Sequence, residues 1–256
     1  MGLWTLTHFY TIIPTFIVFI ALAFLLGWLL KDKDEKIKYI PLQIITIILL
    51  ALEFMKQGYN LHDDNYNLYA LPFHYCSLFL YLFPLHTFYR GKHKEKVEAL
   101  TLACSASVFF FMLIMPTVVY SDGNIIDYFK SFDDFHTVTF HSLVCLYFFL
   151  MIALKFYKYN IKKDFIVMAI FLAAYVIIAL IMTFALDTNF QNLKHCNLAI
   201  VEEIRLNMVA SIGFAGHMIY VLILSILTIL FAFGSYIATK GITTVIEKAT
   251  KKRFKA

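Results

Sequence analysis

A histidine and a cysteine stand two residues apart at the start of a long apolar segment, in Leu71-Pro72-Phe73-His74-Tyr75-Cys76-Ser77-Leu78. An ionisable side chain inside a membrane segment is costly, so it indicates a functional site by default. A cysteine near a helix N-terminus lies among free N–H groups that favour its thiolate. Cys76 therefore has the type and the setting of a nucleophile, and a small apolar packing residue is the alternative interpretation.

The two-residue spacing limits what His74 and Cys76 can do together. On a regular helix, side chains two residues apart point about 200° apart. Pro72 suits the first helical position, which predicts a regular first turn. His74 would then be a poor base for Cys76. We expect His141, which begins a later apolar segment from the same side of the membrane, to be the base. For His74, a packing role with a hydrogen bond to a carbonyl is the alternative.

Other polar residues fall at a similar depth, at the ends of other apolar segments. We expect four of them to contact the substrate: Glu53, Asp187, Asn189 and His217. Each also has an ordinary structural interpretation. Glu53 and Lys56 are spaced as a helical ion pair, Asn189 could end a helix, and His217 follows small residues typical of helix packing. His136, which follows two aspartates, is interpreted as a solvated loop residue.

Long apolar runs that recur along the whole chain must position these residues. Of the 256 residues, 61% are hydrophobic, which is typical of an integral membrane protein. The sequence predicts an all-α, polytopic, seven-transmembrane-helix bundle that forms one membrane domain, residues 1–256. The expected spans are 9–30, 40–57, 71–89, 98–120, 137–156, 164–186 and 213–238, each long enough for a ~30 Å hydrocarbon core.

The basic residues favour one orientation of this bundle. Eighteen of the 22 Lys and Arg residues fall in alternate connections and the tail. Acidic residues, including Asp63, Asp64, Asp122 and Asp127, occupy the other connections. The positive-inside rule therefore predicts an outside N-terminus and a cytoplasmic C-terminus in the cell membrane. Because this pattern explains the net charge of +5, no nucleic-acid partner is expected.

The segment from Asn189 to Ile212 is long for a loop. Residues 197–207 combine apolar side chains with charged ones in a pattern that predicts a short amphipathic helix, lying in the outer membrane interface. The same residues could instead begin a long seventh span.

Residues 71–76 resemble the L-P-x-H-x-C signature of the seven-span YwaF-type family, which includes eukaryotic transmembrane protein 164. The resemblance extends to Glu53, to Thr139-Phe140-His141 and to Asn189-Phe190. Eukaryotic members are similar to lipid acyltransferases, in which the signature cysteine takes an acyl chain from a phospholipid and passes it to a lysolipid. The resemblance implies that Cys76 accepts the acyl chain and that His74 belongs to its site.

Three functions stay open at this point. The first is a lipid acyltransferase or acyl-ester hydrolase of the outer leaflet, in which Cys76 is the nucleophile, a histidine is the base and a phospholipid or lysolipid is the substrate. The second is a zinc-dependent membrane hydrolase that uses His74, His141, His217 and Asp187. The third is a non-catalytic lipid or small-solute binding or transport protein. The zinc ligands would each have to come from a different helix, because the chain has no H-x-x-x-H pair. The first function is therefore favoured, and with it no cofactor and no metal are expected.

Overall fold

The computed structural model describes residues 4–62 and 66–253, and its described residues form helices, turns and loops with no strand. The α-helices are α1 (Leu6–Leu29), α2 (Glu35–His62), α3 (Phe79–Phe88), α4 (Lys94–Ile114), α5 (Asp122–Ile126), α6 (Phe132–Ala153), α7 (Ile161–Ala185), α8 (Ala199–Ile212) and α9 (Phe214–Arg253). Short 3₁₀ turns are η1 (Leu68–Ala70), η2 (Tyr75–Leu78), η3 (Pro116–Val118) and η4 (Phe190–Asn192). Asp63 and Asp64 lie outside the described residues.

Six helices of the described chain are long and apolar enough to cross a membrane, namely α1, α2, α4, α6, α7 and α9. They overlap six of the seven expected spans. The remaining one, 71–89, contains only the shorter apolar run Tyr75–Phe88, which rises by about 21 Å. The chain is thus all-helical and multi-pass, while the seventh span and the orientation of the termini stay predictions.

Polar side chains begin several of these helices by binding N–H groups that have no partner within the helix. Thr5 accepts the first-turn N–H of His8 in α1, Ser131 caps α6 and Asn160 caps α7. The short helix expected at 197–207 is present as α8, at Ala199–Ile212, and its place in the membrane interface stays a prediction. It ends at Gly213, which has a φ of +60°. Glycine adopts this left-handed backbone without strain, so the chain turns there directly into α9.

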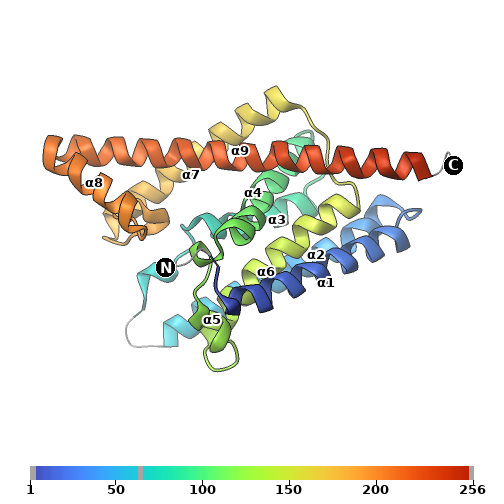
Figure 1. Ribbon diagram of the computed structural model, residues 1–256, viewed down its shortest axis with the longest axis horizontal. Helices are drawn as coiled ribbons and strands as arrows, with labels where there is room; N and C mark the ends of the chain where they lie inside the picture. The colour runs from blue at the N-terminus through green and yellow to red at the C-terminus, as the bar shows by residue number, and fades with distance from the viewer. Residues whose placement is uncertain (1–3, 63–65, 254–256) are drawn as a thin grey trace.

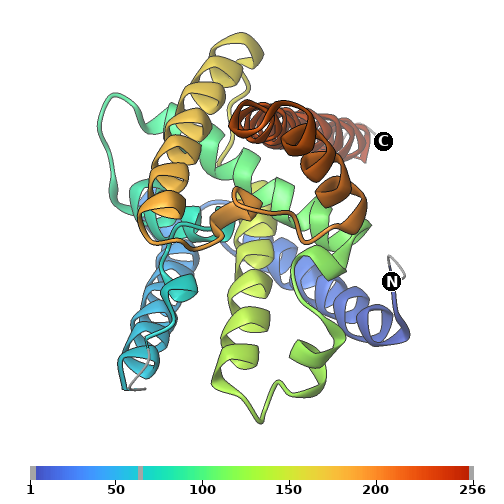
Figure 2. The same ribbon diagram turned by 90° about the vertical axis from the view of Figure 1, so that its left-hand side faces the viewer.

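The main core surrounds α4 and α6. Small residues of α4, including Ala99, Ala103 and Ala106, are buried against neighbouring helices, and α6 packs against α1, α2 and α4. A second apolar cluster joins α7, the loop after it and α9, through residues such as Val176, Leu193 and Tyr220. Figures 1 and 2 show α7, α8 and the first half of α9 on one side of the molecule and α1, α2 and α6 on the other, with α3 and α4 between them.

Gly216 allows α8 and α9 to approach closely. A Cβ atom at this position would lie 2.1 Å from the carbonyl oxygen of Met208 in α8. Gly216→Ala should therefore force the two helices apart and lower the free energy of unfolding by about 1–3 kcal/mol. Thermal unfolding in detergent measures this loss. Gly234→Ala is the matched control on α9, because a Cβ there meets nothing within 4 Å, and an equal loss in both variants would contradict the prediction.

Candidate functional site

A cavity of about 830 Å³ brings together the three residues expected to be catalytic. His74, Cys76 and His141 all lie on its wall, although they come from the loop before η2, from η2 itself and from α6. The rest of the wall comes from η1, η2, α4, η3 and the residue after it, α9, and the segment between α7 and α8. Further lining residues are Tyr69, Tyr75, Val108, Phe111, Val118, Val119, Gln191, Asn192, Asn197, Leu224, Leu227, Thr228, Leu230 and Phe231.

The irregular backbone of the signature explains how His74 and Cys76 reach one cavity. The expected regular first turn is wrong: His74 is extended, with φ −78° and ψ 159°, and η2 is a 3₁₀ turn that precedes α3. An extended residue directly before a 3₁₀ turn does not follow the 100° rotation of an α-helix. The argument that placed the two side chains on opposite sides therefore does not apply.

Two side chains from distant segments hold this irregular loop in place. The Tyr175 hydroxyl of α7 contacts the carbonyl oxygens of Pro72 at 3.2 Å and His74 at 2.9 Å. Gln191 Nε2 donates to the carbonyl oxygen of Phe73 at 2.9 Å. The His74 oxygen also accepts the N–H of Ser77 at 2.9 Å, so the two side chains add partners to a loop that has few backbone hydrogen bonds of its own.

Tyr175→Phe keeps the ring and removes the shared donor. We expect the free energy of unfolding to fall by about 1 kcal/mol, because the part-buried carbonyl oxygens of Pro72 and His74 lose this donor. Hydrogen exchange of the amides of residues 73–77 should also become faster. Tyr10→Phe, at an exposed position on α1, is the control. Unchanged exchange in Tyr175→Phe would show that the hydroxyl does not hold the loop.

The tautomers of the two cavity histidines follow from their hydrogen bonds. His141 Nδ1 lies 2.7 Å from the carbonyl oxygen of Thr137, and His74 Nε2 lies 2.9 Å from that of Tyr69. A carbonyl oxygen only accepts, so each of these nitrogens donates. In the neutral rings, His141 Nε2 and His74 Nδ1 therefore keep a lone pair and are able to take a proton.

Ring contacts further fix the orientation of His74. The centroid of its ring lies 4.2 Å from that of Tyr69 and 5.3 Å from that of Phe190.

Within the described structure, no hydrogen bond joins the Cys76 thiol to either imidazole. The other free cysteines, Cys104, Cys145 and Cys196, are buried and lie off the cavity wall.

The four residues expected to contact the substrate are not among the residues that line this cavity: Glu53, Asp187, Asn189 and His217. Glu53 pairs with Lys56 at 2.9 Å, which confirms the expected ion pair, and lies 3.6 Å from Nε2 of the buried His136. The prediction of a solvated His136 is therefore wrong. Asp187 binds Lys194 on the surface, and His217 packs among aromatic rings of α7 and α9.

Asn189 organises the loop after α7. Its Oδ1 accepts the N–H groups of Lys194 and His195 at 2.9 and 3.3 Å, and its Nδ2 donates to the His195 carbonyl. The amides that do reach the cavity are Gln191, Asn192 and Asn197, which the sequence analysis missed. A run of amide side chains next to the predicted site was the available signal.

A comparison with known families settles what kind of chain carries this site. The sequence model of the TMEM164 family matches residues 3–236, which is nearly the whole chain. The chain belongs to the TMEM164 family. No curated protein and no solved structure matches it.

In this TMEM164-family chain, Glu202 positions the Asn197 side of the cavity. Its carboxylate binds Arg205 at 2.5 and 2.9 Å and accepts the N–H of Cys196 at 2.7 Å. The Arg205 guanidinium, helped by this N–H, lowers the pKa of Glu202 to about 2. The carboxylate is thus ionised at neutral pH and ties the start of α8 to the loop that bears Asn197.

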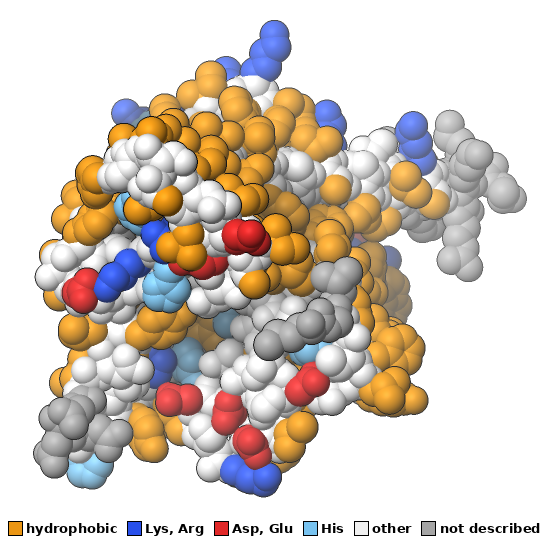
Figure 3. Space-filling view, turned by 60° about the vertical axis from the view of Figure 1, so that its left-hand side comes forward, with side chains coloured by type: hydrophobic (Ala, Val, Ile, Leu, Met, Phe, Trp, Pro, Cys, Tyr) orange, Lys and Arg blue, Asp and Glu red, His pale blue; other side chains and the backbone are white. Residues whose placement is uncertain are grey.

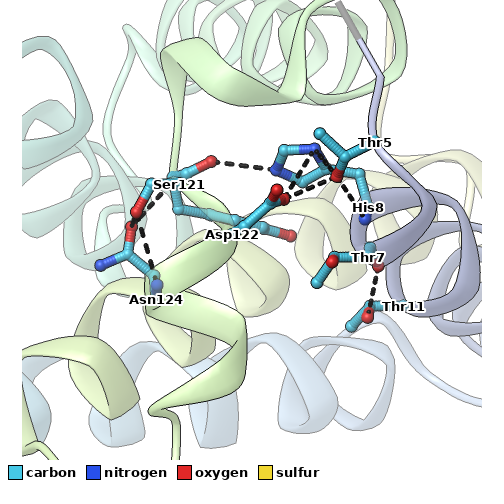
Figure 4. Close-up of polar contacts among 8 residues, drawn as sticks. Thr5, Thr7, His8, Thr11, Ser121, Asp122 and Asn124 are labelled. Carbon is cyan, nitrogen blue, oxygen red and sulfur yellow. Dashed lines mark hydrogen bonds and ion pairs between the residues drawn. The ribbon is translucent and has the colours of Figure 1, made fainter. Parts of the chain in front are cut away.

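A polar cluster of Thr5, His8 and Asp122 joins the start of α1 to the segment after η3 (Figure 4). This segment directly follows Val118 and Val119 of the cavity wall. His8 is fully buried, and its Nε2 donates to the carbonyl oxygen of Tyr120 at 3.2 Å. Thr5 donates its one hydroxyl hydrogen to Asp122 at 2.6 Å, while His8 Nδ1 lies 3.0 Å from the same hydroxyl oxygen and 3.5 Å from Asp122. These contacts join the start of α1 to the residues that follow η3.

The donors considered for zinc are not brought together. His74 and His141 line the cavity, whereas His217 and Asp187 do not. Across the described ranges, no group of three His, Cys, Asp or Glu residues is close enough to hold a metal ion. Charged and histidine side chains instead gather on one face, which is hollowed at its centre (Figure 3).

Proposed function

We propose that this TMEM164-family protein is a lipid acyltransferase or acyl-ester hydrolase that forms a thioester on Cys76, in the outer leaflet of the cell membrane. The observation that carries the proposal is one cavity wall with a thiol and two imidazoles, each with a lone pair on one nitrogen. A nucleophile with a nearby base is the arrangement that acyl transfer needs.

The reaction would proceed in two balanced steps. His141 Nε2 takes the Cys76 thiol proton, and the sulfur attacks the ester carbonyl of a phospholipid. The C–O bond breaks, the imidazolium returns its proton to the departing lysolipid oxygen, and the acyl chain stays on sulfur. Water or the hydroxyl of a second lysolipid then attacks the thioester carbonyl and gives its proton to His141 Nε2. The C–S bond breaks, the acyl chain leaves as a free acid or a new ester, and the imidazolium returns the proton to the Cys76 sulfur.

The composition of the cavity supports a lipid substrate. Val108, Phe111, Leu224 and Phe231 give the wall an apolar part suited to an acyl chain, and Gln191, Asn192 and Asn197 add amide side chains to the same wall. Gln191 and Asn192 amide groups would be available to donate hydrogen bonds to an ester oxygen once it enters.

Non-catalytic lipid binding is the second candidate function. It is favoured by one specific observation, because within the described residues the Cys76 thiol has no hydrogen bond to His74 or His141. A chain that only bound or moved lipid would need the same apolar wall and no activated thiol.

Intact-protein mass spectrometry distinguishes these functions. The purified chain is incubated in phospholipid nanodiscs without added lysolipid, so that the thioester lacks its lipid acceptor. We expect one fatty-acyl mass on the wild type, released by hydroxylamine, absent from Cys76→Ala and retained in the buried control Cys145→Ala. An adduct that survives in Cys76→Ala would remove Cys76 as the acyl carrier, and the absence of any adduct would favour plain lipid binding.

A further inference from the structure

The cavity has two chemically different rims. One rim is apolar and is formed by η3 and α9: Val118 is 46% exposed, Leu227 57% and Leu230 51%. The other rim is formed by Tyr69 and by Asn197, which are also exposed and carry polar groups. The site is therefore open toward two kinds of surroundings.

The apolar rim lies on a helix that is a candidate membrane span. The cavity residues Leu224, Leu227, Thr228 and Phe231 recur at helical spacing and share one face of α9. They cover about 10 Å of the helix. In a bilayer, exposed leucines on such a helix face hydrocarbon, so this rim opens sideways toward lipid chains.

An aromatic pair closes the wall between α4 and α9. The rings of Phe111 and Phe231 have centroids 4.1 Å apart, and both residues line the cavity. Behind them, Val108 of α4 also lines the cavity but is only 4% exposed. A molecule that touches Val108 must therefore have entered the cavity.

The lining carries no fixed charge. Among the described lining residues there is no Lys, Arg, Asp or Glu, and the neighbouring Glu53 and Lys56 neutralise each other. A phosphate group inside such a cavity would be buried without a counter-charge, which is costly. The part of the ligand inside is therefore uncharged, as an ester, a hydroxyl group and a hydrocarbon chain are.

We propose that a membrane glycerolipid enters this cavity sideways from the bilayer, between η3 and α9. Its acyl chain lies along the Leu224–Phe231 face, its ester reaches Cys76, and its uncharged glycerol end meets Gln191, Asn192 and Asn197. The charged headgroup stays outside the cavity, at the rim of Tyr69 and Asn197. The position of the ester rests on the proposed thioester function, whereas the lateral route does not.

Photo-crosslinking tests the lateral route without requiring catalysis. The full chain with Cys76→Ala is placed in nanodiscs that contain phosphatidylcholine with a diazirine in its acyl chain, irradiated and mapped by peptide mass spectrometry. We expect an adduct at Val108 that unlabelled phosphatidylcholine competes away. Absence of this adduct would overturn the proposal.

Two matched tryptophan variants test the route itself. Leu227→Trp fills the apolar rim and should lower the Val108 adduct by about tenfold. Ile226→Trp lies next to it on α9, is 47% exposed and lies off the cavity wall, so it should leave the adduct unchanged. Equal labelling in both variants, or a loss caused only by Asn197→Trp at the polar rim, would contradict access from the bilayer.

The outcomes separate this inference from the proposed function. A Val108 adduct that depends on Leu227, with no thioester on the wild type, would support the lateral route and refute the acyl-enzyme. A thioester on Cys76 that forms equally in Leu227→Trp would support the enzyme and refute the route.

Discussion

His141→Gln is expected to slow acylation of Cys76 by roughly 10²–10⁴-fold, the usual contribution of a positioned general base. Its Nδ1 donates to the Thr137 carbonyl, so the lone pair of the neutral ring is on Nε2. Glutamine fills much of the same space but takes no proton near neutral pH. The rate is measured by quenching the nanodisc reaction at intervals and weighing the intact protein.

His217→Gln is the matched control for His141→Gln. It removes a histidine of α9 that packs against aromatic rings and does not line the cavity. We expect wild-type acylation in this variant. If His141→Gln acylated at the wild-type rate, His74 would become the base, and His74→Gln would then show the loss instead.

His8→Leu is expected to release the segment that follows η3. The leucine cannot donate to the Tyr120 carbonyl or pair with Asp122, so contacts that join α1 to residues 120–122 are lost together. A loss of about 1.5–3 kcal/mol in local stability corresponds to roughly 10- to 100-fold faster amide exchange. Hydrogen exchange of residues 117–124 measures it.

Thr11→Val provides the comparison on the same helix. The Thr11 hydroxyl donates within α1, to the Thr7 carbonyl, so its removal should leave exchange at 117–124 unchanged. Because Val118 and Val119 line the cavity and the Tyr120 ring lies 6.4 Å from that of His141, His8→Leu should also slow acylation. If the amides of residues 117–124 exchanged in His8→Leu as slowly as in the wild type, His8 would not hold this segment.

The long helices were predictable because apolar length alone indicates a membrane span. The start of the expected span at 71–89 shows what this reasoning does not reach. Its hydropathy is continuous, yet the backbone becomes helical only at Tyr75 and begins with a 3₁₀ turn. Hydrogen bonds from Tyr175 and Gln191, more than 100 residues away, stabilise that irregular start, and no local pattern encodes them.

The site residues divide in a similar way. The signature motif drew attention to His74 and Cys76, which line one cavity with His141, while their catalytic roles stay a prediction. Shared membrane depth wrongly suggested that Asp187 and His217 would join them, because depth fixes one coordinate and the order of helix packing fixes the others. Gln191 and Asn192 reach the cavity from left-handed backbone conformations, with φ of 52° and 59°, which residue type alone does not reveal.

The length of α9 has a practical consequence for studying this protein. A helix from Phe214 to Arg253 rises by about 60 Å, roughly twice the hydrocarbon thickness of a bilayer. The face that lines the cavity and the region around Lys248 therefore belong to one stiff rod. A helical fusion protein spliced in register after Lys248 would be held rigidly to the cavity wall. Such a fiducial would give electron microscopy the mass and the features needed to align particles of a chain this small.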